Sequence, residues 1–309
     1  MSSITLLGPQ FREPNLHFAL RELGIEGRLV AVTAGWQERE GENDELASHV
    51  GLPVTDLALY ARTEQAFARD RELQVAHRRR QARLGEMQDL YRLRLEHAKD
   101  AARELLAREG DPEILRRSRR AALGALRALD REHLRAIERE HAAFRREYRP
   151  QQRASVVRHI DELRKLIDPA AAVLIAGGHV AVLVNRLRLF DLRRLIGGKP
   201  VIAWSAGAMA IADRIVLFHD HPPQGAGNAE VFDAGLGFLE DVVPLPHAQT
   251  RLALHNHERL ALFARRFAPA HCVTLDHGSA LHWRGGRLRR SANAWRLSRQ
   301  GALAEVRAP

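Results

Sequence analysis

Apolar residues in the first 61 positions come as short runs separated by amphipathic stretches. Ile4 to Leu7, Arg28 to Thr33 and Val54 to Leu59 have the length and composition of strands. Asn15 to Leu23 and Asp44 to Val50 lie between them, with apolar residues at helical spacing. Strands that alternate with helices predict a parallel sheet that is covered on both faces.

The pattern changes over residues 62–149, where apolar residues recur every three or four positions and β-branched residues are almost absent. Glu109 to Pro112 interrupts the periodicity, since Gly ends a helix and Asp-Pro begins the next. We therefore predict two long helices folded back on each other, each spanning roughly 50 to 70 Å. Their inward positions are Leu84, Met87, Tyr91, Leu95, Ala98, Ala102 and Leu105, then Ala122, Leu126, Leu129, His133, Ile137, Phe144 and Tyr148.

Strand and helix patterns return after residue 150. The predicted elements are a helix over Ala154 to Ile167, a strand over Ala171 to Ala176, a helix over His179 to Ile196 and a strand over Pro200 to Trp204. We therefore predict that residues 1–61 and 150–309 form one α/β domain. Residues 62–149 are predicted to be an inserted antiparallel helical hairpin that resembles a coiled coil.

The formal net charge is +10, and nearly all of the positive charge is arginine. Residues 62–149 alone hold 23 Arg and Lys against 16 Asp and Glu. This excess fits recognition of anions by guanidinium groups, or simply a coding bias toward arginine with a solvated outer helix face. The hairpin has few exposed aromatic positions, so the sequence does not favour nucleic-acid binding. If the hairpin has a binding function, we expect it to bind a protein partner or a second copy of the chain.

Composition also restricts location and cofactor chemistry. The single cysteine, Cys272, rules out a disulfide within the chain and a cysteine-rich zinc site, and we expect it in the core. The start of the chain lacks a signal-peptide pattern, and no apolar run approaches about 18 residues. We expect a cytoplasmic protein without a membrane span. His219, His221, His255 and His257 are too irregularly spaced to predict a metal site, and we expect no cofactor.

The stretch Val201 to Met209, VIAWSAGAM, carries the strongest chemical signal. Ser205 follows an apolar strand, precedes a helix-compatible run and has small neighbours, as a strand-to-helix turn that exposes a nucleophile requires. Ala203 stands where the general pattern has its first glycine. Gly177 and Gly178 follow the preceding strand, where backbone N–H groups can approach a developing oxyanion.

Three strings, AGGHVAVLVNRLRLFDL, GKPVIAWSAGAMAIA and GLGFLEDVVPLPHAQTR, resemble the S51 serine peptidase family, which includes aspartyl dipeptidase and cyanophycinase. The resemblance covers residues 170–283 well and residues 1–61 more loosely, and it does not cover the hairpin. It implies a three-layer α/β fold like that of class I glutamine amidotransferases, with a mostly parallel sheet. Amidotransferase activity itself is not expected, because those enzymes use a cysteine nucleophile.

By position, the resemblance implies that Ser205 is the nucleophile, His247 the base and Asp220 the acid that orients it. It implies further that the N–H groups of Gly178 and Ala206 hold the oxyanion. Gly177, His179 and Arg251 are expected to contact the substrate. The implied reaction is hydrolysis of a peptide or isopeptide bond through an acyl-enzyme, in a peptide-like or acidic small substrate.

This chain departs from the family pattern at three positions. Ala176 replaces a glycine of the loop, His179 stands where Asn is frequent, and Ala248 replaces an aromatic residue. These departures leave a second hypothesis open, in which a degenerate scaffold serves assembly through its basic hairpin. Asp276 is expected either to line the pocket or to cap a turn.

Overall fold

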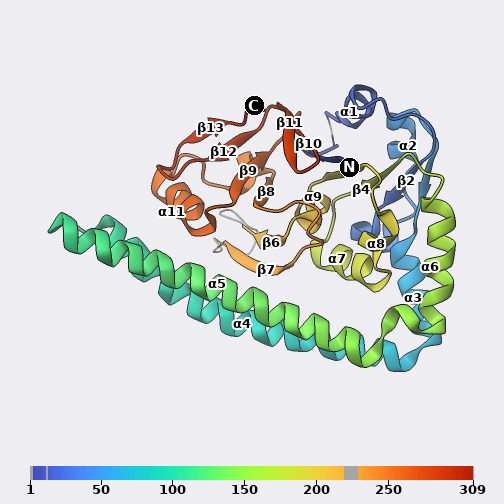
Figure 1. The fold of residues 1–309 in the computed structure, drawn as a ribbon, viewed down its shortest axis with the longest axis horizontal. Coiled ribbons are helices and arrows are strands. Elements are labelled where there is room, and N and C mark those ends of the chain that lie inside the picture. The colour runs from blue at the N-terminus through green and yellow to red at the C-terminus, as the bar shows by residue number, and fades with distance from the viewer. Residues whose placement is uncertain (1–2, 12, 219–228, 309) are drawn as a thin grey trace.

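The computed structural model describes residues 3–11, 13–218 and 229–308. A seven-stranded sheet in the order β11-β10-β1-β5-β4-β2-β3 forms the centre of the α/β part (Figure 1). The five strands from β1 to β3 in this order are parallel, whereas β10 and β11 pair antiparallel at one edge. The strands are β1 (Ser3–Leu7), β2 (Leu29–Val32), β3 (Val54–Asp56), β4 (Ala172–Ile175), β5 (Val201–Trp204), β10 (Ala280–Arg284) and β11 (Arg287–Ala292).

Helices cover both faces of this sheet, which confirms the predicted three-layer α/β class. In β2, Leu29 and Ala31 point to the face covered by α1 (Leu16–Glu22) and α2 (Asp44–Val50). Val30 and Val32 point to the opposite face. That face is covered by α3 (Leu59–Arg69), α6 (Ala154–Ile167), α7 (Val180–Leu189), α8 (Leu192–Ile196) and α9 (Ala206–Ile211). Because both faces are buried at the centre of the sheet, β2, β4 and β5 are apolar throughout rather than alternating.

The chain beyond β5 builds two smaller sheets that the sequence patterns did not indicate. One is the antiparallel pair β6 (Arg214–Leu217) and β7 (Glu230–Ala234). The other has the order β13-β12-β9-β8 and includes the parallel pair β8 (Val242–Pro246) and β9 (His271–Leu275). Its other strands are β12 (Trp295–Leu297) and β13 (Leu303–Glu305), and the helices α10 (Ala248–Arg251) and α11 (His257–Phe267) lie between β8 and β9 in the chain. Cys272 on β9 is buried, as expected.

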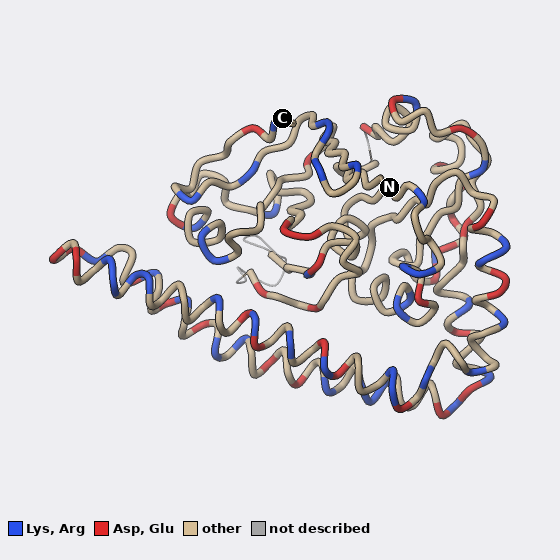
Figure 2. Tube along the Cα trace, viewed as in Figure 1, with Lys and Arg blue, Asp and Glu red and all other residues tan. Residues whose placement is uncertain are grey.

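The two predicted long helices are present. They are α4 (Arg71–Ala107) and α5 (Pro112–Tyr148), each about 55 Å long at 1.5 Å per residue. Asp111 caps α5, since its carboxylate accepts hydrogen bonds from the N–H groups of Glu113 and Ile114. Basic and acidic residues alternate along both arms (Figure 2). Ion pairs such as Arg83–Glu140 join the two arms.

The hairpin is docked along the α/β part rather than free in solvent (Figure 1). Near its base, Leu73, Ala76 and Phe144 belong to the same core as the sheet helices. Farther along, Tyr91, Leu95 and Leu126 share a second core with β7, β8 and α11, and the tip extends past α11. The division of the chain into residues 1–61 with 150–309 and an inserted 62–149 stays a prediction.

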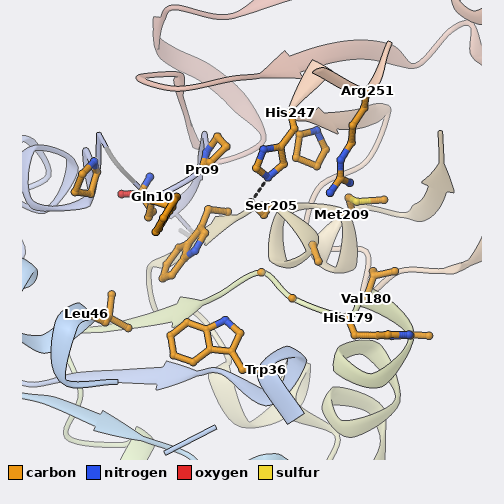
Figure 3. Close-up of a pocket in the computed structure, with 18 of the residues that line it drawn as sticks. Pro9, Gln10, Trp36, Leu46, His179, Val180, Ser205, Met209, His247 and Arg251 are labelled. Atoms are coloured by element: carbon orange, nitrogen blue, oxygen red, sulfur yellow. Dashed lines mark hydrogen bonds between the residues drawn. The ribbon is translucent and has the colours of Figure 1, made fainter. Parts of the chain in front are cut away.

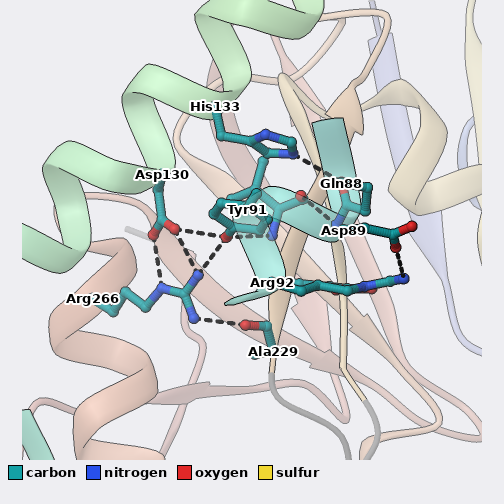
Figure 4. Close-up of polar contacts among 10 residues, drawn as sticks. Gln88, Asp89, Tyr91, Arg92, Asp130, His133, Ala229 and Arg266 are labelled. Carbon is teal, nitrogen blue, oxygen red and sulfur yellow. Dashed lines mark hydrogen bonds and ion pairs between the residues drawn. The ribbon is translucent and has the colours of Figure 1, made fainter. Parts of the chain in front are cut away.

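A buried polar cluster fastens the hairpin to the rest of the protein (Figure 4). Arg266 of α11 donates to both carboxylate oxygens of Asp130 on α5, at 2.6 and 2.7 Å, and to the hydroxyl of Tyr91 on α4 at 2.8 Å. The Tyr91 hydroxyl donates to Asp130 and accepts the N–H of Val231 on β7. Since Tyr91, Asp130 and Arg266 are 2, 8 and 5% exposed, these contacts replace water almost completely.

Three boundaries differ from the sequence-based expectations. The predicted helix over His179 to Ile196 is wrong in its middle, because Asp191 takes a left-handed conformation (φ 49°) and separates α7 from α8. The third strand ends at Asp56, since Leu59 already begins α3. A break at Asp70, whose carboxylate caps α4, separates α3 from the first arm of the hairpin. No helix in the described part of the chain is long and apolar enough to cross a membrane.

Candidate active site

Ser205 occupies the turn between β5 and α9 in a backbone conformation that non-glycine residues rarely adopt (φ 52°, ψ −125°). The turn is possible because Gly207 brings α9 against the end of β4. A Cβ atom at Gly207 would lie 2.2 Å from the carbonyl oxygen of Ile175. Ala203 is fully buried in the core beneath the sheet, so a methyl group is accommodated where the general pattern has glycine. The sequence string therefore folds as the strained turn that it predicts.

Gly177 and Gly178 lie directly beside this turn. A Cβ atom at Gly177 would approach the Cβ of Ser205 to 2.7 Å, so only glycine lets the loop backbone pass so close. Gly178 has a positive φ of 104°, and a side chain there would collide with the carbonyl group of Gly35. The loops after β2, β4 and β5 thus meet at the carboxyl edge of the sheet, where binding sites of parallel sheets gather.

Two backbone N–H groups are available beside the serine. Ala206 is the first residue of α9, so its N–H has no acceptor within the helix. The Gly178 N–H belongs to the loop that packs on Gly35. Neither N–H group donates a hydrogen bond to another described residue. Such donors can stabilise a negatively charged oxygen that develops next to Ser205.

His247 reaches the serine from the end of β8. Its Nε2 lies 3.2 Å from Ser205 Oγ (Figure 3). The residue has a left-handed backbone (φ 58°, ψ 38°), and its N–H donates to the carbonyl oxygen of Leu275. Asp276 does not line the pocket; its carboxylate accepts the N–H of Gln249 and so caps α10, the short helix after His247. The carboxylate therefore supports the helix after His247 rather than the turn in which Asp276 itself lies.

Burial, with smaller contributions from the nearby Arg251 and His277, lowers the pKa of His247 to about 4. The imidazole is therefore neutral near pH 7 and can accept a proton from Ser205. No carboxylate of the described residues hydrogen-bonds to the ring of His247. Asp220, the acid expected beside it, lies outside the described residues, as do His219 and His221.

Ser205 and His247 open into a pocket of about 760 Å³. Aromatic and apolar side chains form much of its wall, among them Trp36, Trp204, Met209 and Phe232. Arg251 lines the pocket one helical turn after His247 (Figure 3). Burial lowers the pKa of its guanidinium, and no described residue pairs with it. A partly buried cation at the wall of a pocket, with no partner in the described part of the chain, suits an anionic group of a bound molecule.

His179, expected to contact substrate, has a second function in the fold. Its ring accepts the N–H of Val182 at 3.4 Å and so caps α7, while the residue also lines the pocket. Gly177 and Gly178 line the same pocket. Of the residues implied by the resemblance, the structure therefore brings together all those that it describes: Ser205, His247, Gly177, Gly178, His179, Ala206 and Arg251.

Several pocket residues were not indicated by the sequence motifs. Pro9 and Gln10 follow β1, and Trp36 follows β2. The rule that sites form at the carboxyl ends of parallel strands could have identified these loops. Leu46 and His49 of α2 and Phe232 of β7 have no such signal, because they come from elements that do not end at this edge. Within residues 3–11, 13–218 and 229–308, no three His, Cys, Asp or Glu side chains form a group that could hold a metal ion.

A known protein family matches the part of the chain that contains this site. The model of peptidase family S51 matches residues 128–291, which is more than half of the chain and includes Gly177, Ser205, His247 and Arg251. No curated protein matches the chain in sequence.

Two solved structures were compared over nearly the whole chain. A peptidase from an acI-B1 actinobacterium is 14% identical, with 100% of this chain and 95% of that chain covered and a TM-score of 0.49. A putative peptidase E from Listeria monocytogenes EGD-e is 13% identical, with 96 and 100% covered and a TM-score of 0.45.

Proposed function

The chain belongs to peptidase family S51, and we propose that it is a serine hydrolase that cleaves a peptide or isopeptide bond. The observation that carries this proposal is the 3.2 Å separation of Ser205 Oγ and His247 Nε2 inside the pocket. A hydroxyl is activated when a neutral imidazole within hydrogen-bond reach takes its proton. The lowered pKa of His247 keeps the imidazole in the form that this step needs.

In the proposed reaction, Ser205 Oγ attacks the carbonyl carbon of the scissile bond while His247 Nε2 takes the hydroxyl proton. The carbonyl oxygen gains the negative charge between the N–H groups of Gly178 and Ala206, each donor contributing about 3 kcal/mol to transition-state stabilisation. His247 then returns the proton to the leaving amine, which breaks the C–N bond and leaves an acyl-enzyme. A water molecule, deprotonated by His247, hydrolyses the ester and frees Ser205.

We assign to Asp220 the task of orienting His247, from its position fifteen residues after Ser205. A carboxylate at Nδ1 would hold the tautomer that leaves Nε2 free to accept the proton. Arg251 is proposed to bind a carboxylate of the substrate, which supports a substrate with an aspartyl or other acidic group. The aromatic wall formed by Trp36 and Trp204 suits the apolar part of a peptide-like molecule.

A fluorophosphonate probe, which forms a covalent bond with activated serines, tests this proposal directly. We expect labelling of the wild-type protein and none of Ser205→Ala or His247→Ala. Ser291, an ordinary serine outside the pocket, provides the matched control, and Ser291→Ala should label like the wild type. Equal labelling of wild type and Ser205→Ala would contradict the proposal and favour the alternative of a non-catalytic scaffold.

A further inference from the structure

A small second cavity lies at the base of the hairpin, where α4 and α5 meet α7. It has a volume of about 20 Å³ and is lined by His77 and Arg80 of α4, Arg145 of α5, and Asn185 and Arg188 of α7. About 10 to 15 Å³ suffices for one water molecule, so this cavity holds a single small solute. None of its residues lines the active-site pocket.

Arg80 is the unusual member of this group. It is only 7% exposed, yet no described residue forms an ion pair with it. One nitrogen, Nη2, donates to the neutral amide oxygen of Asn185 at 3.0 Å, and the guanidinium lies 4.2 Å from the ring centre of Phe144. Its Nε–H is buried without an acceptor. A buried guanidinium normally has a carboxylate or another anion as its partner.

The surroundings add positive charge rather than compensate it. Arg145 and Arg188 line the same cavity, and Asp233 and Glu140, the carboxylates whose charge acts on Arg80, are already paired. Asp233 accepts two hydrogen bonds from Arg188, at 2.7 and 3.0 Å, and one from His141 at 2.8 Å. Glu140 pairs with Arg83. Asp233 therefore compensates Arg188, whereas Arg80 and Arg145 add positive charge at the cavity without an ion pair to any described residue.

His77 is a second possible donor at this cavity. Its side chain is 7% exposed and makes no hydrogen bond with any described residue, although its ring packs against Phe67 and Phe144. A neutral imidazole always carries one N–H group. The buried Nε–H of Arg80 and the ring N–H of His77 thus border one cavity, and neither has an acceptor among the described residues.

We propose that this cavity binds a small monovalent inorganic anion of the size of chloride. The anion would accept hydrogen bonds from Arg80 and His77 and would offset the excess charge of Arg80 and Arg145. A water molecule can accept the same hydrogen bonds but cannot neutralise that charge. Phosphate, sulfate and carboxylate-bearing molecules are too large for about 20 Å³, a space that holds little more than one water molecule.

The bound anion has a structural consequence that does not depend on catalysis by Ser205. Asn185, which contacts Arg80, donates to the carbonyl oxygen of Ala181, a residue that lines the active-site pocket. Arg188 holds Asp233 of β7 next to Phe232, another pocket residue. The anion site therefore joins the base of the hairpin to two walls of the pocket.

Crystals of the full-length wild-type protein grown or soaked in sodium bromide give the direct test. We expect an anomalous bromide peak in the cavity, within hydrogen-bond distance of Arg80 and His77. The absence of a peak there would mean that the cavity holds water only and would overturn the proposal.

Thermal unfolding in sodium chloride and in sodium gluconate at equal ionic strength gives the solution test. We expect a saturable rise of several degrees in Tm that is specific to chloride, retained in Arg79→Met at an exposed neighbouring position and lost in Arg80→Met. The same chloride response in Arg80→Met would contradict the assignment. A bromide peak without any chloride-specific shift in the wild type would indicate binding at crystal concentration only and would equally overturn it. If Arg80→Met fails to fold, the two wild-type measurements decide.

Discussion

The Oγ atom of Ser205 lies 3.2 Å from Nε2 of His247, although the strands that precede the two residues belong to different sheets. Ser205 follows β5 of the seven-stranded sheet, and His247 follows β8 of the four-stranded sheet. Each of them has a positive φ, 52° for Ser205 and 58° for His247. Two strained strand ends that face each other are expected where function, rather than local propensity, selects the backbone conformation.

The pH dependence of kcat/KM should reveal whether Asp220 acts on His247. Burial, Arg251 and His277 lower the pKa of His247 to about 4 without any carboxylate of the described residues. A carboxylate at Nδ1 stabilises the protonated imidazole and raises this pKa. We therefore expect the acidic limb of the wild-type profile to lie above pH 4 and to move down toward pH 4 in Asp220→Asn, with a lower kcat. An unchanged limb in Asp220→Asn would remove Asp220 from the proposed triad.

Gly177→Ala should damage activity far more than stability. The added methyl group would lie 2.7 Å from the Cβ of Ser205 and would force the loop or the nucleophile to move. A displacement near 1 Å can lower the rate about 100-fold, which is the loss in kcat/KM that we expect. Gly198→Ala is the matched control, since its added methyl group meets nothing within 4 Å and it lies outside the pocket. Steady-state kinetics beside thermal unfolding would separate the two effects, and equal activities would contradict the proposed loop geometry.

Arg251→Met should weaken binding of acidic substrates selectively. A charge-assisted hydrogen bond contributes about 1.5 to 3 kcal/mol, so we expect KM for a substrate with a carboxylate to rise roughly 10- to 150-fold. The KM of the corresponding uncharged amide should change little. Because Arg251 has no partner among the described residues, its replacement should leave Tm unchanged or raise it. A parallel loss for both substrates would assign Arg251 a structural role instead.

The buried contact between Arg266 and Asp130 should dominate the stability of hairpin docking. Asp130→Asn or Arg266→Met would each leave a buried group unpaired, at a cost of about 3 to 5 kcal/mol in the free energy of unfolding. Urea unfolding measures this loss, and the double variant should lose less than the sum of the two single changes.

The exposed ion pair Arg94–Glu132, which also joins the two arms, is the control for this pair. Arg94→Gln should change the free energy of unfolding by no more than about 1 kcal/mol. Comparable losses at the two sites would show that the hairpin depends on its surface charges rather than on the buried cluster. Deletion of the whole hairpin is the less informative experiment, because it would expose the apolar core that Leu126 shares with α11.

The sequence predicts features that depend on neighbouring residues better than features that depend on contacts between distant segments. Asp44–Val50 and Ala154–Ile167 are helices with the boundaries that their spacing predicts, because helix hydrogen bonds and caps involve near neighbours. The strand-to-helix turn at Ser205 could be predicted for the same reason, because it depends on the residues immediately around it. The left-handed Asp191 was missed, since nothing in its immediate sequence distinguishes a continuing helix from a broken one.

By itself, the sequence determined the alternating α/β pattern, the hairpin with its turn at Gly110 to Pro112, and the local form of the Ser205 turn. Only the tertiary structure decided that Tyr91, Asp130 and Arg266 fasten the hairpin, and that Trp36 and Phe232 share a wall with Ser205. The reason is physical: propensity, periodicity and capping act over a few residues, whereas pockets and buried polar clusters arise from packing between distant segments, such as those of Tyr91 and Arg266, which are 175 positions apart.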